Sequence, residues 1–108
     1  MSTAVGKEAE DRASLYLQKE GYTILIRNFH SKFGEIDIVA KKANVLHFCE
    51  VKYSQSYDPI VRITPSKMAK IIKTIDYYFL KTKTSYDYEI DAILVTEKNI
   101  ELIKNISY

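Results

Sequence analysis

The sequence is poor in cysteine, glycine and histidine, and each shortage excludes a class of site. Its 108 residues include one cysteine, three glycines and two histidines. A single cysteine excludes an intrachain disulfide, and Cys49 stands in an apolar stretch, where we expect a small core residue. Three glycines leave no glycine-rich phosphate loop. The two histidines, His30 and His47, match no zinc-binding spacing.

Long hydrophobic runs and a strong excess of charge are also absent. No uninterrupted apolar run approaches the roughly 18 residues of a membrane span, and residues 1–12 lack the apolar segment of a secretory signal. With the lone cysteine, these features predict a cytoplasmic protein. The net charge of +2 and the isoelectric point of about 8.6 are too mild to indicate nucleic-acid binding by themselves.

What remains is an ordinary globular composition, with 46% hydrophobic and 28% charged residues. Length and composition predict one domain over residues 1–108. Hydrophobic spacing and turn residues predict the elements in this order: a helix over about 3–20 stopped by Gly21, a strand at 22–29, a β-hairpin at 34–52, a loop at 53–63, a helix beginning with Thr64 as N-cap and Pro65, and strands at 88–95 and 100–103. The second helix is expected to bury Met68, Ile71, Ile72, Ile75 and Phe79. This order predicts an α/β fold with a mixed sheet flanked by helices.

The predicted hairpin carries a group of charges on one face. Because strand side chains alternate with period two, Glu35, Asp37, Glu50 and Lys52 point to the same side. With a turn centred on residues 42–43, Asp37 and Glu50 are diagonal neighbours, roughly 7–8 Å apart at the backbone. Like charges on neighbouring strands are costly, and a divalent cation such as Mg²⁺ would offset that cost. The alternative is a solvent-facing sheet on which Lys52 neutralises Glu50.

Other candidate residues have two interpretations each. Glu10 borders the apolar stripe of the first helix, so it is either a solvated carboxylate near the helix start or a further acid leaning toward the sheet. Tyr53 is placed to stack on a base, and Arg62 and Lys67 are placed to meet phosphates. The alternative is an ordinary loop and a solvated helix face.

Several motifs, taken together, resemble a known family. The residues that carry the resemblance are Gly34-Glu35-Ile36-Asp37, Phe48-Cys49-Glu50-Val51-Lys52, Gly6 and Glu10-Asp11-Arg12-Ala13, Leu17 through Gly21-Tyr22, Leu25 with Arg27-Asn28, Thr64 with Lys67, and Tyr88-Glu89-Ile90-Asp91. They resemble the YraN-like family of uncharacterised bacterial proteins, which is similar to archaeal Holliday junction resolvases and belongs to the PD-(D/E)XK nuclease superfamily. The resemblance covers nearly the whole chain. It implies a restriction-endonuclease-like fold.

The resemblance also implies a chemistry. Asp37 and Glu50 would hold Mg²⁺ or Mn²⁺, with the Val51 carbonyl completing the protein ligands. Lys52 would orient the attacking water and steady the developing charge, and Glu10 would join the site as a further acid. The implied activity is metal-dependent hydrolysis of phosphodiester bonds in nucleic acid.

The implied partner is nucleic acid, with branched or structured DNA as the substrate by analogy. Resolvase relatives act as homodimers, so a homodimer is a further expectation. One departure from the family pattern is Ser54, which stands where a basic residue is usual. It favours the alternative of a non-catalytic nucleic-acid-binding module on the same fold.

Overall fold

The chain alternates helices with strands in the predicted order. The computed structural model describes residues 4–55 and 63–106. Within these ranges the elements are α1 (Ala4–Lys19), β1 (Thr23–His30), β2 (Glu35–Lys42), β3 (Val45–Tyr53), α2 (Pro65–Thr82), β4 (Asp87–Val95) and β5 (Ile100–Ile103). The α-β-β-β-α-β-β order and the mixed sheet are therefore confirmed.

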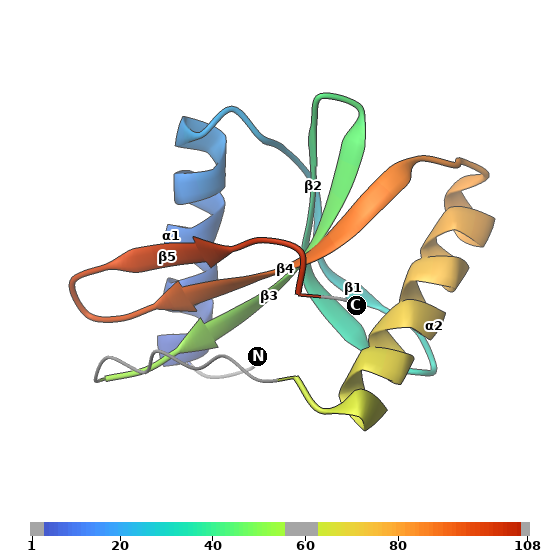
Figure 1. Ribbon diagram of the computed structural model, residues 1–108. Coiled ribbons are helices and arrows are strands. Elements are labelled where there is room, and N and C mark those ends of the chain that lie inside the picture. The colour runs from blue at the N-terminus through green and yellow to red at the C-terminus, as the bar shows by residue number, and fades with distance from the viewer. Residues whose placement is uncertain (1–3, 56–62, 107–108) are drawn as a thin grey trace.

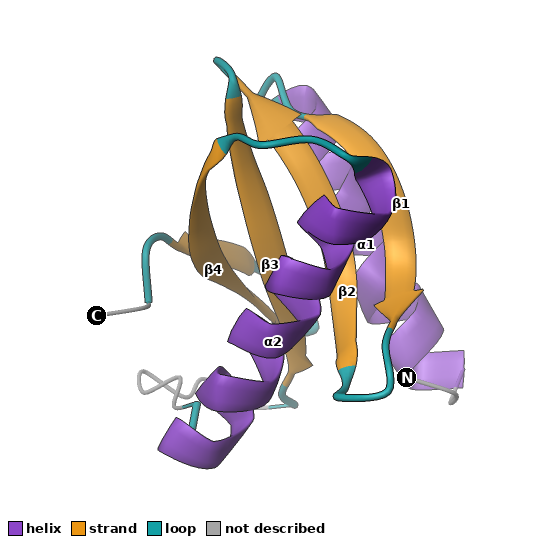
Figure 2. Cartoon of the chain, turned by 90° about the vertical axis from the view of Figure 1, so that its right-hand side faces the viewer, coloured by secondary structure: helices purple, strands orange, loops and turns teal. Residues whose placement is uncertain are grey.

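The five strands of the described chain form one sheet in the order β1-β2-β3-β4-β5. Neighbouring strands are antiparallel except β3 and β4, which are parallel. A parallel pair requires a crossover connection, and α2 lies within it. The helices cover opposite faces of the sheet, α1 on one side and α2 on the other (Figures 1 and 2).

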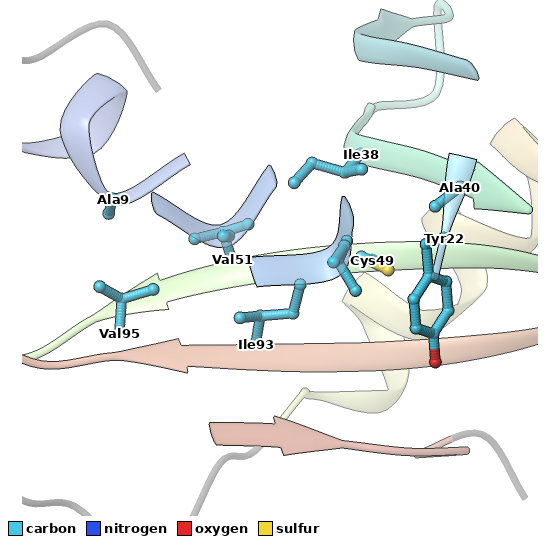
Figure 3. Close-up of a cluster of buried hydrophobic side chains, with 10 residues drawn as sticks. Ala9, Tyr22, Ile38, Ala40, Cys49, Val51, Ile93 and Val95 are labelled. Carbon is cyan, nitrogen blue, oxygen red and sulfur yellow. The ribbon is translucent and has the colours of Figure 1, made fainter. Parts of the chain in front are cut away.

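The α1 face of the sheet holds the first hydrophobic core. Ala9, Ala13 and Leu17 recur at helical spacing and are almost fully buried. They pack on side chains from three strands and from the connection between α1 and β1: Tyr22, Ile38, Ala40, Cys49, Val51, Ile93 and Val95 (Figure 3). Cys49 is thus a buried core residue, as expected.

The α2 face holds the second core, and here one expectation was wrong. Ile71 and Ile75 are buried, and Met68 and Phe79 pack against the same cluster. Ile72, however, is 40% exposed. Thr74 and Tyr78 take the inward positions instead, so the buried stripe is rotated about the helix axis from the predicted one.

The register of the central hairpin also differs from the prediction. A turn at residues 42–43 would pair Val39 with Leu46, but Val39 pairs with Phe48 and Lys42 with Val45. The turn residues are Ala43 and Asn44, both with positive φ (51° and 63°), as a two-residue type I′ turn requires. The shift is two residues, an even number, so every side chain stays on its predicted face.

The predicted helix boundaries agree with the structure. Gly21 adopts a φ of 91° after α1, and the Tyr22 amide donates to the Leu17 carbonyl at 2.9 Å, which is a glycine-terminated helix end. Thr64 is the N-cap of α2, and its side chain accepts a hydrogen bond from the Lys67 amide at 3.1 Å. Neither helix of the described chain is both long and apolar enough to cross a membrane.

Candidate active site

A cleft of about 560 Å³ lies at the ends of β2 and β3, beside the first turns of both helices. Its lining residues are Val5, Gly6, Glu35, Asp37, Glu50, Val51, Lys52, Tyr53 and Lys67. Most of the candidates named from the sequence are among them. The structure therefore brings these residues to one place, although Val5 and Lys67 are 62 residues apart in the sequence.

The cleft forms where the ladder between β2 and β3 stops. Paired residues extend only to Ile38 and Cys49. Beyond them the Asp37 side chain replaces a backbone partner, because its Oδ2 accepts a hydrogen bond from the Val51 amide at 2.8 Å. The amide and carbonyl of one strand residue point to the same edge, so the Val51 carbonyl also faces β2. This orientation is the one that a carbonyl ligand shared with Asp37 requires.

Asp37 and Glu50 are both buried, with only 6% and 4% of their surface exposed. Burial raises the pKa of the Asp37 carboxyl, the Val51 amide opposes that rise, and the charge of Glu10 adds to it. Burial is also the largest cause that raises the pKa of Glu50 to about 7, and the Asp37 charge is the second. The two acids therefore disfavour each other's ionised form.

Two lysines approach these acids. Lys67 Nζ, from the first turn of α2, lies 3.5 Å from Glu50 Oε2. Lys52 is partly buried, and burial lowers the pKa of its ammonium, with the neighbouring Lys67 charge as the second cause. A lysine with a lowered pKa gives up its proton more readily, so Lys52 is suited to share a proton with a nearby nucleophile.

Glu10 lies behind the cleft and does not line it. Glu10 is 1% exposed, and its Oε1 accepts hydrogen bonds from the Asn28 side-chain amide at 3.0 Å and from the Arg27 guanidinium at 3.2 and 3.3 Å. Glu10 is thus a buried, paired acid and not the solvated carboxylate of the first interpretation. It still acts on the site through its charge, which contributes to the raised pKa of Asp37.

The remaining candidates have different positions. Tyr53 is partly buried, lines the cleft and packs against the α1 core. Arg62 lies outside the described residues. The approach of Lys67 to Glu50 was not predicted, because no sequence pattern relates a residue of α2 to a strand. Glu10 is paired with Arg27 and Asn28. In the sequence these two partners were visible only as part of the family resemblance.

The structure offers a test of whether these residues suit a divalent cation. Glu50 Oε1 is buried and has no hydrogen-bond partner among the described residues. A buried carboxylate oxygen without a partner is costly unless it is protonated or binds a metal. Two carboxylates and a backbone carbonyl supply the oxygen ligands that Mg²⁺ and Mn²⁺ prefer. The donor set therefore fits the cation that the resemblance implies.

Comparison with solved structures identifies the fold. The chain is similar to a 1.6 Å structure of a Holliday junction resolvase from the archaeal hyperthermophile Archaeoglobus fulgidus, with a TM-score of 0.61 and 17% sequence identity. The match covers 88% of this chain and 72% of the resolvase. The fold is thus the resolvase type within the restriction-endonuclease-like class, as the motifs predicted.

Comparison of sequences identifies the family. The model of the uncharacterised protein family UPF0102 matches residues 9–95. A UPF0102 protein of Campylobacter fetus is 49% identical over 95% of this chain and 93% of its own length. UPF0102 proteins of Campylobacter lari (50%, covering 95% and 93%) and a Nitratiruptor species (43%, covering 98% and 95%) are similar as well. The chain therefore belongs to the UPF0102, or YraN-like, family.

Proposed function

We propose that this protein hydrolyses phosphodiester bonds in nucleic acid in a reaction that depends on Mg²⁺ or Mn²⁺. One observation carries the proposal: two buried carboxylates, Asp37 and Glu50, and the lysine Lys52 line one open cleft, and Glu50 Oε1 has no partner there among the described residues. Such an arrangement is costly to a fold in the absence of a ligand. The fold shared with a resolvase raises the expectation by analogy only.

Each residue has a distinct role in the proposed reaction. Asp37, Glu50 and the Val51 carbonyl would hold the cation, which would supply Lewis-acid chemistry at a phosphate oxygen. Lys52 orients the attacking water and accepts a proton from it. The water oxygen bonds to phosphorus, the bond from phosphorus to the leaving sugar oxygen breaks, and that oxygen takes up a proton from solvent. Lys67 supplies fixed positive charge beside the phosphate.

The test is a cleavage assay with a four-way DNA junction, linear duplex DNA, single-stranded DNA and RNA. Mg²⁺ or Mn²⁺ is added to one series and EDTA to the other. We expect cleavage of at least one substrate with metal only. Asp37→Asn, Glu50→Gln and Lys52→Met should each reduce its rate by about 100-fold or more.

Matched controls for this assay come from the outer surface of α2. Asp76→Asn and Lys81→Met change one exposed acid and one exposed lysine away from the cleft, and both should cleave like wild type. If Asp37→Asn, Glu50→Gln and Lys52→Met retained the same activity as the two controls, the cleavage would come from a contaminant. The proposal would then fail.

A second candidate function is a nucleic-acid-binding module without turnover. It is favoured by Ser54, which follows the cleft residues at the position where a phosphate-binding basic residue is usual in the family. The Ser54 amide donates to the Val95 carbonyl at 2.9 Å, so its backbone is hydrogen-bonded to β4. Salt-sensitive binding of the same nucleic acids, with no cleavage under any metal and no loss in Asp37→Asn, would support this function over hydrolysis.

A further inference from the structure

A second cluster of metal-ligating side chains lies away from the cleft. His47 of β3 pairs directly with Glu89 of β4, and Asp91 follows two residues later on the same face. His47 Nδ1 lies 2.8 Å from Asp91 Oδ2 and 3.7 Å from Glu89 Oε2. One ligand atom from each of the three residues lies within 4.8 Å of the others. No residue of this cluster lines the cleft.

Two of the three residues are buried, and the cluster contains more acid than base. His47 is 4% exposed and Asp91 is fully buried, and the ion pairs of both acids in the described chain run to His47. One imidazole, even when protonated, offsets only one of two carboxylates. Glu89 Oε2 is a buried atom without a hydrogen-bond partner among the described residues. A hydrogen-bonded His–Asp pair leaves this second carboxylate unexplained. The alternative to a cation is a proton shared between Glu89 and Asp91, because a hydrogen bond with Asp91 raises the pKa of Glu89.

We propose that His47, Glu89 and Asp91 form a second divalent-cation site, which takes a zinc-type ion. An imidazole nitrogen with two carboxylate oxygens suits Zn²⁺ or Co²⁺, whereas Mg²⁺ prefers oxygen ligands alone. Two ligands about 2.0–2.1 Å from a tetrahedral ion lie about 3.3 Å apart. The separations of 2.8 and 3.7 Å bracket that value. The Glu89 side chain is 21% exposed, which leaves access for a water as the fourth ligand.

The neighbouring contacts indicate a structural role for this ion. The second oxygen of Asp91, Oδ1, accepts a hydrogen bond from the Asn105 amide at 2.9 Å, and the Ile106 amide donates to the Ile90 carbonyl at 2.8 Å. An ion here would join β3 to β4 and, through Asp91, to the segment that follows β5. It would take the place of the hydrogen bond between His47 Nδ1 and Asp91 Oδ2.

The test uses metal-stripped protein with the cleft disabled by Asp37→Asn and Glu50→Gln. Calorimetric titration with Zn²⁺ or Co²⁺ should show one ion per chain. In ¹⁵N spectra of the imidazoles, the His47 Nδ1 resonance should move on titration. The His30 resonances should not move, because that side chain is 70% exposed at the end of β1 and lies outside the cluster. The thermal midpoint should rise by about 5 °C or more with saturating metal.

Glu89→Gln on the same background removes one ligand charge with little change of shape, and we expect it to weaken binding at least tenfold. Glu97→Gln is the matched control, an exposed acid in the turn after β4, and it should bind like the parent. An unmoved His47 resonance at saturating Zn²⁺ would overturn the proposal and leave a buried hydrogen-bonded pair. Equal affinity in Glu89→Gln would overturn it too. The His47 signal needs no substitution in the cluster, so the test does not depend on the folding of Glu89→Gln.

Discussion

Glu50 combines a buried side chain with a pKa raised to about 7. In the unfolded chain a glutamate titrates near 4.3. Between these two values the folded state holds a proton that the unfolded state has lost, so the free energy of unfolding falls as the pH rises through this window. Above about pH 7 Glu50 is ionised in both states, and the folded state bears the full cost of its buried charge. The metal-free protein therefore carries an electrostatic penalty at pH 8 that is absent near pH 4.

Glu50→Gln should remove this penalty. In EDTA, the variant should gain roughly 1–3 kcal/mol in free energy of unfolding over wild type at pH 8, and much less at pH 5. Urea unfolding at both pH values measures the difference. The exposed Glu97→Gln should show no such pH-dependent gain. A Glu50→Gln variant that is less stable than wild type at pH 8 would mean that the side chain is stabilised there by its lysine neighbours.

Ala43 is strained for a different reason, because a residue with a Cβ atom occupies the left-handed region at the hairpin turn (φ 51°). Glycine adopts this conformation without steric cost. Ala43→Gly should therefore stabilise the protein by about 1 kcal/mol, measured as a higher urea midpoint. Ala69→Gly, at an exposed position inside α2, should instead destabilise it by about 1 kcal/mol. If both changes destabilised, the turn would differ from the one described.

At the scale of the element, the central hairpin shows why a candidate site can be predicted although the register is wrong. The turn was placed one residue too early because neither Ala43 nor Asn44 is the glycine that usually marks a type I′ turn. The pairing moved by two residues, and the side-chain period is also two. Asp37 and Glu50 therefore stayed on one face, and the prediction of two neighbouring acids depended only on that face.

The second helix shows the opposite case, in which the start was predicted correctly and one position of the buried face, Ile72, was not. Thr64 and Pro65 have strong positional preferences that operate within a few residues. The orientation of the helix about its axis depends instead on the sheet below it. There Phe48 contacts Tyr78 and Phe79 edge-on at ring-centroid distances of 5.5 and 5.8 Å, and these contacts place Ile72 outward.

The N-cap of α2 can be tested by substitution, because Thr64 caps the turn of the helix that carries Lys67. Thr64→Ala removes the hydrogen bond to the Lys67 amide and should lower the free energy of unfolding by about 1 kcal/mol. Urea unfolding measures this loss. Ser66→Ala alters an exposed hydroxyl two residues later and should change the stability by less than about 0.5 kcal/mol. An equal effect of both substitutions would show that the cap is not what stabilises the start of the helix.

At the scale of the whole molecule, the sequence could not predict the contacts between elements that are distant along the chain. Spacing placed Glu10 beside the apolar stripe of α1, but its burial depends on Arg27 and Asn28 of β1. Asp91 interrupted an apolar strand with no visible partner, and that partner is His47, 44 residues away. Both acids are explained only by the sheet, which brings β1 to α1 and β3 to β4.

The distribution of charge over the whole molecule sets how nucleic acid would bind. A net charge of only +2 gives little general attraction, so the basic groups at the cleft should account for a large share of the salt dependence. Lys67 stands at the start of α2 with 45% of its side chain exposed. If it contacts one phosphate, Lys67→Ala should reduce the slope of log affinity against log salt concentration by about 1.

Lys81 is the matched control for this experiment, since it lies on the same helix about 21 Å from Lys67 along the axis. Lys81→Ala makes the same change in net charge and should leave the slope unaltered. Fluorescence anisotropy with a four-way junction and a linear duplex, from 25 to about 200 mM salt, measures both slopes. Equal reductions in the two variants would mean that binding responds to net charge alone. In that case the orientation of the nucleic acid toward Asp37 and Glu50 would lose its support.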